Sequence, residues 1–325
     1  MPKTDSVAAF IEAVGRRDIE RGRRIVEAMI AHEKAHNNLH SAQILQHALT
    51  VWGRQVMSLP ELPTTIRSLV WAESPVRTFA DLVLPADVLS LIHTFLTERR
   101  AADRLRAAGL PVAHTLLFTG PPGTGKTSIA SAIAADLNLP LLAAQNHALI
   151  DSHLGETSRN IGALFDYARH TPVVLFIDEL DTLGALRRDT GDSAGKEHQA
   201  ILTAILTIMD HLPDTSILVT ASNRPDLIDP ALLRRFDLLL TLPLPSRDQI
   251  QDYLVRYQTV HQIPWPVALS LLVHDLAGHP WSTIERTCQQ LHKQHLLAPD
   301  PSSSVRSAYE RFKVVERIEE STVSR

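Results

Sequence analysis

The residue pattern with the clearest chemical meaning is a glycine-rich loop that ends in a lysine and a threonine. It fits G-x-x-x-x-G-K-[ST] and comprises Gly120, Pro121, Pro122, Gly123, Thr124, Gly125, Lys126 and Thr127. Its glycines permit tight turns that present backbone N–H groups to an anion. Lys126 can reach the β- and γ-phosphates of a nucleotide, and Thr127 can place its hydroxyl on Mg²⁺. The loop therefore predicts a site for a nucleoside triphosphate and its magnesium ion.

The segments on both sides of this loop support the same interpretation. Residues 114–119 predict a buried strand, and residues 128–137 predict an apolar-rich helix. A phosphate-binding loop needs such a strand–loop–helix context. The alternative is a glycine-rich turn that only joins a strand to a helix. We add Ser128, the residue after the loop, to the predicted binding set.

A second group of polar residues supplies carboxylates. Residues 173–177 are all apolar and predict a buried strand, with Asp178 and Glu179 directly after it. In open α/β sheets, ligands bind at the carboxyl ends of the strands. Asp178 is predicted to hold Mg²⁺ through water, and Glu179 to polarise the attacking water. The alternative is an ordinary turn at a strand end, and for the nearby Asp181 a helix cap.

Two further positions fit phosphoryl transfer. Asn223 follows an apolar strand-like run, where its side chain can hydrogen-bond the γ-phosphate or the lytic water. The alternative is a turn-forming asparagine ahead of Arg224. Arg234 and Arg235 end a short predicted helix. One of them can be a helix C-cap cation, whereas both together fit charge donors to a phosphate, including one on a neighbouring subunit.

The elements that must position these residues alternate between strand and helix. Strand-like apolar runs occur at 115–119, 140–144, 173–177, 216–221 and 237–242. Helical stretches separate them, and this alternation predicts a parallel sheet with helices on both faces.

Helices dominate the remaining sequence. Residues 6–52 show helical periodicity, and the proline-punctuated segment 54–78 is interpreted as a connector. After the predicted sheet, three helices are expected at 246–261, 266–277 and 281–297.

Composition limits the class of protein. The chain has 325 residues, a formal net charge of −4 and a single cysteine, Cys288. The length predicts two or three domains, and the near-balanced charge argues against nucleic acid or an anionic membrane as an obligate partner. A lone cysteine forms no intrachain disulfide, which fits a reducing compartment. Because no signal-like segment or run of about 18 apolar residues occurs, we expect a cytoplasmic protein without a membrane segment.

Four motifs in order, GPPGTGKT, VVLFIDELD, TASNRPD and DPALLRRFD, resemble the AAA clade of the AAA+ ATPase superfamily. The resemblance covers about residues 77–297. It implies an α/β P-loop NTPase core with a three-layer parallel sheet, a small helical lid and a homo-oligomeric ring, usually a hexamer. It also implies ATP and Mg²⁺ as ligands, Asn223 as sensor 1, and Arg234 and Arg235 as arginine fingers acting in trans. Val83, in a segment resembling the family's lead-in to the domain, is placed at the adenine pocket.

These inferences divide the chain into four predicted parts. The first is a helical region with a linker that recognises a partner or client, and the last is a tail with one further helix. The parts are 1–76 (N-terminal region), 77–245 (ATPase domain), 246–298 (helical lid) and 299–325 (C-terminal tail).

The sequence departs from the family pattern at the loop that many members use to move a polypeptide through the ring. Those members often carry Lys-aromatic-aliphatic-Gly-Glu, whereas here Ser152 replaces the lysine, His153 stands at the aromatic position and Leu154 follows. Imidazole offers less apolar surface than Tyr or Trp. His153 is therefore either a pore residue or a solvated loop residue of an ATPase that does not thread its partner.

The predicted lid also leaves alternatives open. Trp281 stands where the family places small residues over the adenine. It either stacks near the base or packs the lid. The lid lacks the sensor-2 arginine of other AAA+ clades unless Arg286 serves.

A zinc-peptidase pattern, H-E-x-x-H, occurs at His32, Glu33 and His36, and His40 extends the same helix face. In membrane-anchored AAA proteases the peptidase follows the ATPase, whereas this segment precedes it and is short. We therefore favour a solvated or subunit-packing histidine face over a zinc site.

The leading expectation is a Mg²⁺-dependent ATPase ring that remodels or translocates a protein client. The alternative is a regulatory switch that controls a partner effector or protease without threading. A nucleic-acid loader is less favoured because of the charge balance.

Overall fold

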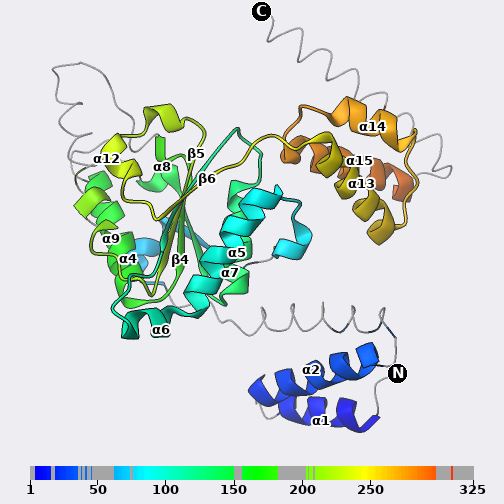
Figure 1. The fold of residues 1–325 in the computed structure, drawn as a ribbon, viewed down its shortest axis with the longest axis horizontal. Coiled ribbons are helices and arrows are strands. Elements are labelled where there is room, and N and C mark those ends of the chain that lie inside the picture. The colour runs from blue at the N-terminus through cyan, green and yellow to red at the C-terminus, as the bar shows by residue number, and fades with distance from the viewer. Residues whose placement is uncertain are drawn as a thin grey trace, which may run out of the picture.

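The computed structural model describes residues 4–15, 19–35, 62–73, 77–149, 156–181 and 205–297 except 208, with single residues at Asn38, Ser41, Leu45, Pro75, Thr203 and Tyr309. Figure 1 shows three parts: a sheet with helices on both sides, a helical group that follows it in sequence, and two N-terminal helices. His153 and Leu154, the predicted pore-loop residues, lie outside the described residues.

The central sheet has six strands in the order β1-β3-β4-β5-β2-β6. Five strands are parallel, whereas β1 pairs antiparallel with β3 at one edge. The prediction of an α/β sheet is confirmed, and its five predicted strands end within one residue of the predicted positions. The strands are β1 (Val70–Glu73), β2 (Thr115–Thr119), β3 (Leu141–Ala144), β4 (Val174–Ile177), β5 (Ile217–Ser222) and β6 (Leu238–Thr241).

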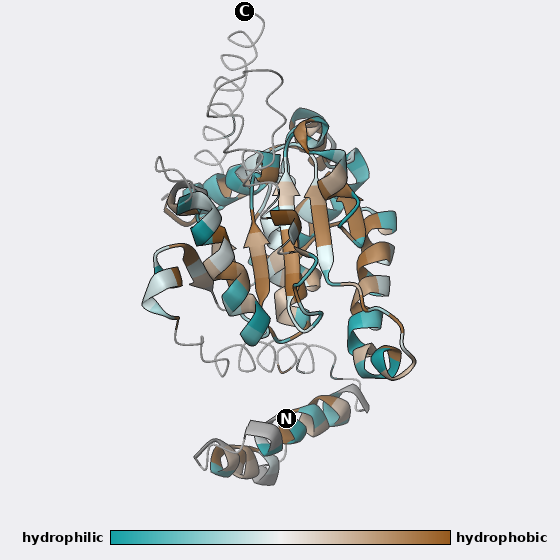
Figure 2. Ribbon diagram, turned by 90° about the vertical axis from the view of Figure 1, so that its left-hand side faces the viewer, coloured by the Kyte–Doolittle hydropathy of each residue, from teal (hydrophilic) through white to brown (hydrophobic). Residues whose placement is uncertain are grey.

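Both faces of the sheet are covered, which is why its strands are almost continuously apolar. Leu116 and Phe118 of β2 pack on one face against α5 (Ala86–Arg100) and α7 (Lys126–Asp136). Leu117 packs on the other face with residues of α4 (Thr64–Arg67) and α9 (Glu156–His170). Figure 2 shows the brown, apolar strands enclosed between helices. This three-layer arrangement encloses the sheet between two layers of helices.

Shorter helices connect these layers. A 3₁₀ turn, η1, leads into α5, and a second, η2, follows β5. Asp229 caps the short helix before β6, because its carboxylate accepts a hydrogen bond of 2.6 Å from the Ala231 N–H. The elements are η1 (Phe79–Asp81), α6 (Ala102–Ala107), α8 (Asn146–Leu149), η2 (Pro225–Leu227) and α12 (Pro230–Leu233).

The helical group after the sheet, which we call the lid, comprises α13 (Arg247–His261), α14 (Leu269–Leu276) and α15 (Trp281–Leu297). A capping box between Ser246 and Gln249 begins α13. The lid has its own apolar core, in which Cys288 and Tyr309 are buried. Tyr309 lies in the predicted tail, so part of that segment packs on the lid.

The N-terminal helices α1 (Thr4–Gly15) and α2 (Ile19–Ala35) form a small pair of their own. Val26 and Ile30 of α2 are buried there, with Phe10 and Leu45 packed against them. Helices were expected in this region. None of the helices in the described part of the chain is both long and apolar enough to cross a bilayer.

The segment 54–78, interpreted as a connector, contains structure that the sequence did not indicate. It includes α4 and the edge strand β1, whose four residues pair with Leu141–Ala144 of β3. The sheet thus begins before the predicted boundary at residue 77. A strand this short shows no clear periodicity, and the flanking Pro63 and Pro75 suggested a break.

Candidate nucleotide-binding site

The glycine-rich loop joins the end of β2 to the start of α7, and its backbone explains its composition. Gly120, Gly123 and Gly125 have φ values of 140°, 75° and 96°, in a region that residues with a Cβ avoid. A Cβ on Gly120 would lie 2.2 Å from the carbonyl oxygen of Leu242, a fixed backbone atom. A Cβ on Gly123 would lie 2.2 Å from Ser282 Oγ at the start of α15. The loop therefore lies in direct contact with both the sheet and the lid.

Lys126 is the first residue of α7, and its side chain is only 6% exposed. Its Nζ donates hydrogen bonds to the carbonyl oxygens of Gly120 and Pro121, at 2.7 and 2.9 Å, and to Asn223 Oδ1 at 2.8 Å. Burial lowers the pKa of Lys126, whereas Asp178 and Asp181 act in the opposite direction. A buried ammonium group thus stands at the end of the sheet, where an anion can replace its neutral acceptors.

Asn223 reaches Lys126 because of the strand register. Thr119 of β2 is paired with Ser222 of β5, so the residues that follow these two strands are neighbours. The Gly120 N–H also donates to the Ser222 carbonyl oxygen at 3.3 Å. The sheet thus brings together two predicted site residues that are 97 positions apart.

Asp178 and Glu179 follow β4, the strand beside β5. Glu179 has φ of 47°, an uncommon conformation for a residue other than glycine, and its N–H donates to Asp178 Oδ1 at 2.8 Å. Such backbone conformations occur at functional sites more often than elsewhere. The turn directs two adjacent carboxylates to the same strand end, and no periodicity in the sequence signals it.

Asp181 has a structural partner that the sequence analysis missed. Ser222 Oγ donates to Asp181 Oδ1 at 2.8 Å and accepts from the Arg224 N–H at 3.0 Å. These bonds join the ends of β4 and β5, and so fix the separation between the carboxylates after β4 and Asn223 after β5.

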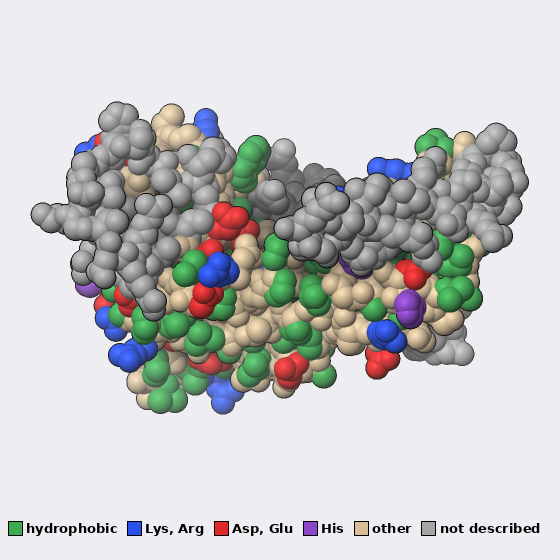
Figure 3. Space-filling model, turned by 90° about the horizontal axis from the view of Figure 1, so that it is seen from above, with side chains coloured by type: hydrophobic (Ala, Val, Ile, Leu, Met, Phe, Trp, Pro, Cys, Tyr) green, Lys and Arg blue, Asp and Glu red, His purple; other side chains and the backbone are tan. Residues whose placement is uncertain are grey.

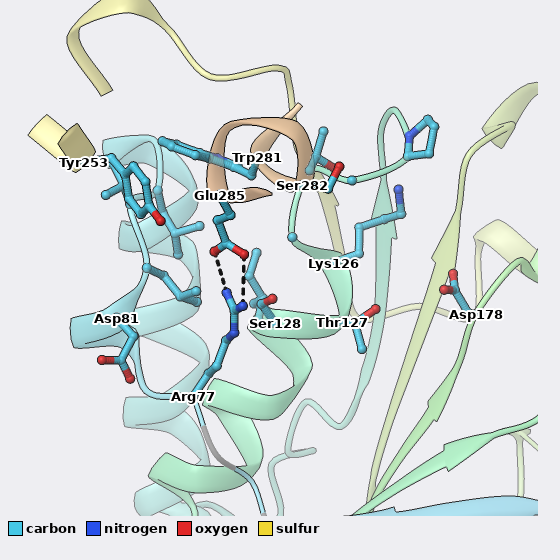
Figure 4. A pocket seen from close by; sticks show the side chains of 18 of the residues that line it. Arg77, Asp81, Lys126, Thr127, Ser128, Asp178, Tyr253, Trp281, Ser282 and Glu285 are labelled. Carbon is cyan, nitrogen blue, oxygen red and sulfur yellow. Dashed lines mark hydrogen bonds and ion pairs between the residues drawn. The ribbon is translucent and has the colours of Figure 1, made fainter. Parts of the chain in front are cut away.

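A pocket of about 330 Å³ opens along the glycine-rich loop. It is lined by many of the predicted site residues: Val83, Pro122, Gly123, Thr124, Gly125, Lys126, Thr127, Ser128, Asp178, Glu179 and Asn223. Gly120 and Pro121 contribute through their carbonyl bonds to Lys126. Figure 4 shows Lys126, Thr127 and Asp178 toward one end of the pocket. The pocket thus presents an ammonium group, a hydroxyl and two carboxylates to one space.

The other end of the pocket contains residues that the sequence analysis did not select. Arg77, Asp81, Tyr253 and Glu285 line it, together with Trp281 (Figure 4). Trp281 packs within the lid, where the centroid of its ring lies 5.4 Å from that of Tyr253, and it also lines the pocket. Its stacking on a base stays a prediction. Burial raises the pKa of Tyr253. Apart from Trp281, no motif singles out these residues, which come from three distant segments of the chain.

The two predicted arginine fingers do not line this pocket. Arg234 and Arg235 follow α12 and are both exposed. Arg235 Nε lies 2.9 Å from Asp210 Oδ1. Arg286 is also exposed and, in the described structure, is not a lining residue. None of these three arginines therefore contributes to the pocket of its own chain, as far as the described residues show.

The pocket's donor set fits a hard divalent cation, because Thr127 and Asp178 offer oxygen atoms. In the H-E-x-x-H segment, Glu33 is only 1% exposed, and its carboxylate accepts a hydrogen bond of 3.0 Å from Asn38 Nδ2. His36 and His40 lie outside the described residues. Among the residues that are described, no three His, Cys, Asp or Glu side chains group as metal ligands.

Charged side chains are mixed on the surface. On the face seen in Figure 3, the coloured Lys and Arg side chains of the described residues stand among Asp and Glu side chains. This distribution agrees with the net charge of −4.

Comparison with known proteins identifies the family. Residues 116–244 match the family model described as "ATPase family associated with various cellular activities (AAA)". The "Uncharacterized AAA family ATPase y4kL" of Sinorhizobium fredii (strain NBRC 101917 / NGR234) is 33% identical over 285 residues, covering 85% of this chain and 84% of that protein.

Two other relatives match over shorter parts of their length. The "ATP-dependent zinc metalloprotease FtsH 3" of Sphaerobacter thermophilus is 35% identical over 239 residues, 71% of this chain and 47% of that protein. The "26S proteasome regulatory subunit 10B" of Dictyostelium discoideum is 43% identical over 143 residues, 42% of this chain and 36% of that protein. The chain thus spans less than half the length of these two. The phosphate loop, the carboxylates after β4 and the long match to an AAA protein lead to one conclusion: the chain belongs to the AAA family of ATPases.

Proposed function

We propose that the pocket binds ATP with Mg²⁺ and hydrolyses it. The observation that supports this most directly is the convergence of Lys126, Asp178, Glu179 and Asn223 on one pocket from the ends of three neighbouring strands. Phosphoryl transfer needs little covalent chemistry from the protein, and depends on positioning and on stabilising charge. An arrangement in which a fixed cation, two carboxylates and an amide face one space meets those needs.

Thr127 and Asp178 are the residues that would hold the magnesium ion, Thr127 through its hydroxyl and Asp178 through water. When bound, the ion supplies charge stabilisation to the phosphate oxygens. Lys126 would release its carbonyl acceptors and bind the β- and γ-phosphates instead. Val83 and the residues of the lid would enclose the base.

Glu179 is proposed to accept a proton from the attacking water. Its carboxylate lies beyond the strained turn after β4 and is exposed to solvent. Asn223 would orient the same water or the γ-phosphate through its amide. Because Asn223 also contacts Lys126, it can respond to the presence of the γ-phosphate.

Arg234 and Arg235 are proposed to act on the pocket of a neighbouring subunit. Their exposure and their position outside the pocket of their own chain support this assignment. For every pocket to receive arginines from a neighbour, the subunits must form a closed ring. We propose a homo-oligomeric ring, most simply a hexamer. Arginines acting in this way stabilise the charge that develops in the transition state.

We propose a protein as the client that the ring remodels or translocates. Two relatives bear the names of a 26S proteasome regulatory subunit and an ATP-dependent zinc metalloprotease, although each match covers less than half of the relative. Helices α1 and α2, within the proposed 1–76 region, would recognise the client or a partner. His153 and Leu154 would form the pore loop.

A non-threading switch that controls a partner effector or protease is the second candidate. The observation that favours it is the histidine at position 153, where the family pattern often has an aromatic residue with more apolar surface. His153→Ala separates the two. Loss of client processing with intact ATPase activity supports threading, whereas unchanged partner function supports the switch.

The test of the proposed ATPase is phosphate release by the purified chain with ATP and Mg²⁺. Lys126→Ala is expected to abolish nucleotide binding, and Glu179→Gln to bind ATP but not hydrolyse it. Undiminished turnover in Glu179→Gln would reject Glu179 as the water-activating residue. The same variant, loaded with ATP, is the form in which a bound client and the oligomer are best captured.

A further inference from the structure

One charged contact joins the lid to the segment in front of the ATPase core, and it lies within the pocket. Arg77 donates from Nη1 and Nη2 to Glu285 Oε1 and Oε2, at 2.8 and 3.0 Å. The two residues are 208 positions apart, and both line the pocket. Figure 4 shows their side chains facing one another, with Trp281 nearby. Two parallel hydrogen bonds of this kind fix both the distance and the orientation of the elements that carry them.

The pair is half-buried and electrically complementary. The Arg77 and Glu285 side chains are 41% and 26% exposed. The pKa of Arg77 lies above its ordinary value, chiefly because of its hydrogen bonds to Glu285, while burial acts in the opposite direction. Attraction to the carboxylate thus outweighs the cost of partial desolvation.

Two other contacts tie the lid to the same region. The Ser282 N–H donates to the Gly123 carbonyl oxygen at 3.1 Å, and Arg256 Nη1 donates to the Ala80 carbonyl oxygen at 2.8 Å. Both of these ties end on a backbone carbonyl. Of the three, the Arg77–Glu285 pair alone joins two side chains that both line the pocket. Glu285 lies on α15, and the first turn of this helix contacts the phosphate loop. Movement of the lid away from the loop therefore has to separate this pair.

We propose that Arg77 and Glu285 form a latch that positions the lid over the pocket and sets the rate of nucleotide release. This inference rests on the proposed function, because it presumes that the pocket holds a nucleotide. The pair acts through the lid rather than on a phosphate, since Lys126 and Asp178 stand toward the other end of the pocket (Figure 4). Breaking the latch therefore accelerates release of the nucleotide.

The experiment measures dissociation of ADP carrying a fluorescent ribose label from the full chain, by stopped-flow displacement with excess ADP. Arg77→Ala and Glu285→Gln are each expected to release the label roughly 3- to 10-fold faster, as for the loss of a well-oriented, half-exposed ion pair. Glu285→Gln keeps the size of the side chain, so it serves if Arg77→Ala folds poorly. The exchanged pair, Arg77→Glu with Glu285→Arg, is expected to restore release to within about twofold of the original rate.

A matched control is available elsewhere in the chain. Arg106 contacts Asp214 through Nε and Nη2 at 3.0 to 3.2 Å, and these side chains are 38% and 28% exposed, but neither lines the pocket. Arg106→Ala is expected to leave ADP release unchanged. Its single-turnover rate at saturating ATP should likewise stay constant, so that a change in Arg106→Ala would indicate general damage rather than loss of a latch.

The possible results are distinct. Faster release in both single variants, recovery in the exchanged pair and no change in Arg106→Ala support the latch. Release at the original rate in Arg77→Ala and Glu285→Gln, from a chain that binds ADP, overturns the latch but not the ATPase. An original chain that binds no ADP or ATP overturns the proposed function and the latch with it.

Discussion

Lys126 and Asn223 are joined by a hydrogen bond of 2.8 Å between Nζ and Oδ1. The bond connects the phosphate loop to the end of β5, and two backbone carbonyls complete the shell of acceptors around the ammonium group. The side chain proposed to hold the phosphates and the one proposed to sense them therefore share a contact.

This contact predicts different effects for two substitutions at Asn223. Asn223→Ala leaves Lys126 with its two carbonyl acceptors, so nucleotide affinity should change little while kcat falls by roughly 10²-fold. Asn223→Asp places a carboxylate beside Lys126 and the phosphates, and should weaken ATP binding by roughly tenfold or more. Calorimetric titration and phosphate release distinguish these effects. Equal loss of affinity in both variants would contradict the assigned role.

Gly120 is predicted to tolerate no side chain. Gly120→Ala places a methyl group against the Leu242 carbonyl oxygen, which cannot move freely. The free energy of unfolding should fall by about 3 kcal/mol. Gly109→Ala is the control, because Gly109 has φ of 71° but nothing within 4 Å of its added Cβ, and should cost only about 1–2 kcal/mol. Urea denaturation measures both, and equal costs would show that the close approach to Leu242 is unimportant.

Arg235 is predicted to matter for turnover and not for binding. Arg235→Ala should leave ADP affinity unchanged and lower kcat by about 10³-fold or more, as for other arginine fingers. Asp210→Asn removes the negative charge beside Arg235 but keeps the arginine, and should preserve most of the activity. Turnover of Arg235→Ala at the original rate would exclude this residue as a finger and leave Arg234 to be tested.

The surroundings of His261 lead us to predict that the free energy of unfolding depends on pH. Its pKa lies below the ordinary value of 6.5, first because of partial burial and second because of repulsion from His292. The ring of Tyr257 also packs 4.3 Å from His261. The unfolded chain therefore binds a proton at a higher pH than the folded chain does, so stability is lost as pH falls through about 6.5 toward the folded pKa.

The variant His261→Gln should show a shallower decline of melting temperature between pH 7.5 and 5 than the original chain. The difference between the two slopes reports on His261 together with its repulsion from the neighbouring His292. Parallel slopes would mean that folding does not perturb the protonation of this residue.

The sequence predicts the residues at strand ends much better than those at the far end of the pocket. Asp178 and Asn223 follow apolar runs that must be buried strands, and parallel pairing brings such ends together. Arg77 and Glu285 carry no such signal, because their contact depends on how the lid folds back over the core. The turn at Glu179 and the short strand β1 were also missed. Backbone conformation at a single residue and pairing of four residues leave no periodic pattern.

We propose that each site is completed by a neighbouring subunit. The direct test mixes two inactive proteins. Lys126→Ala cannot hold the phosphates but keeps both arginines. The double variant Arg234→Ala with Arg235→Ala keeps an intact pocket but supplies no cation to its neighbour. We predict that each alone is inactive and that phosphate release returns when the two are mixed and allowed to assemble. A mixture that co-assembles and stays inactive would contradict a shared site.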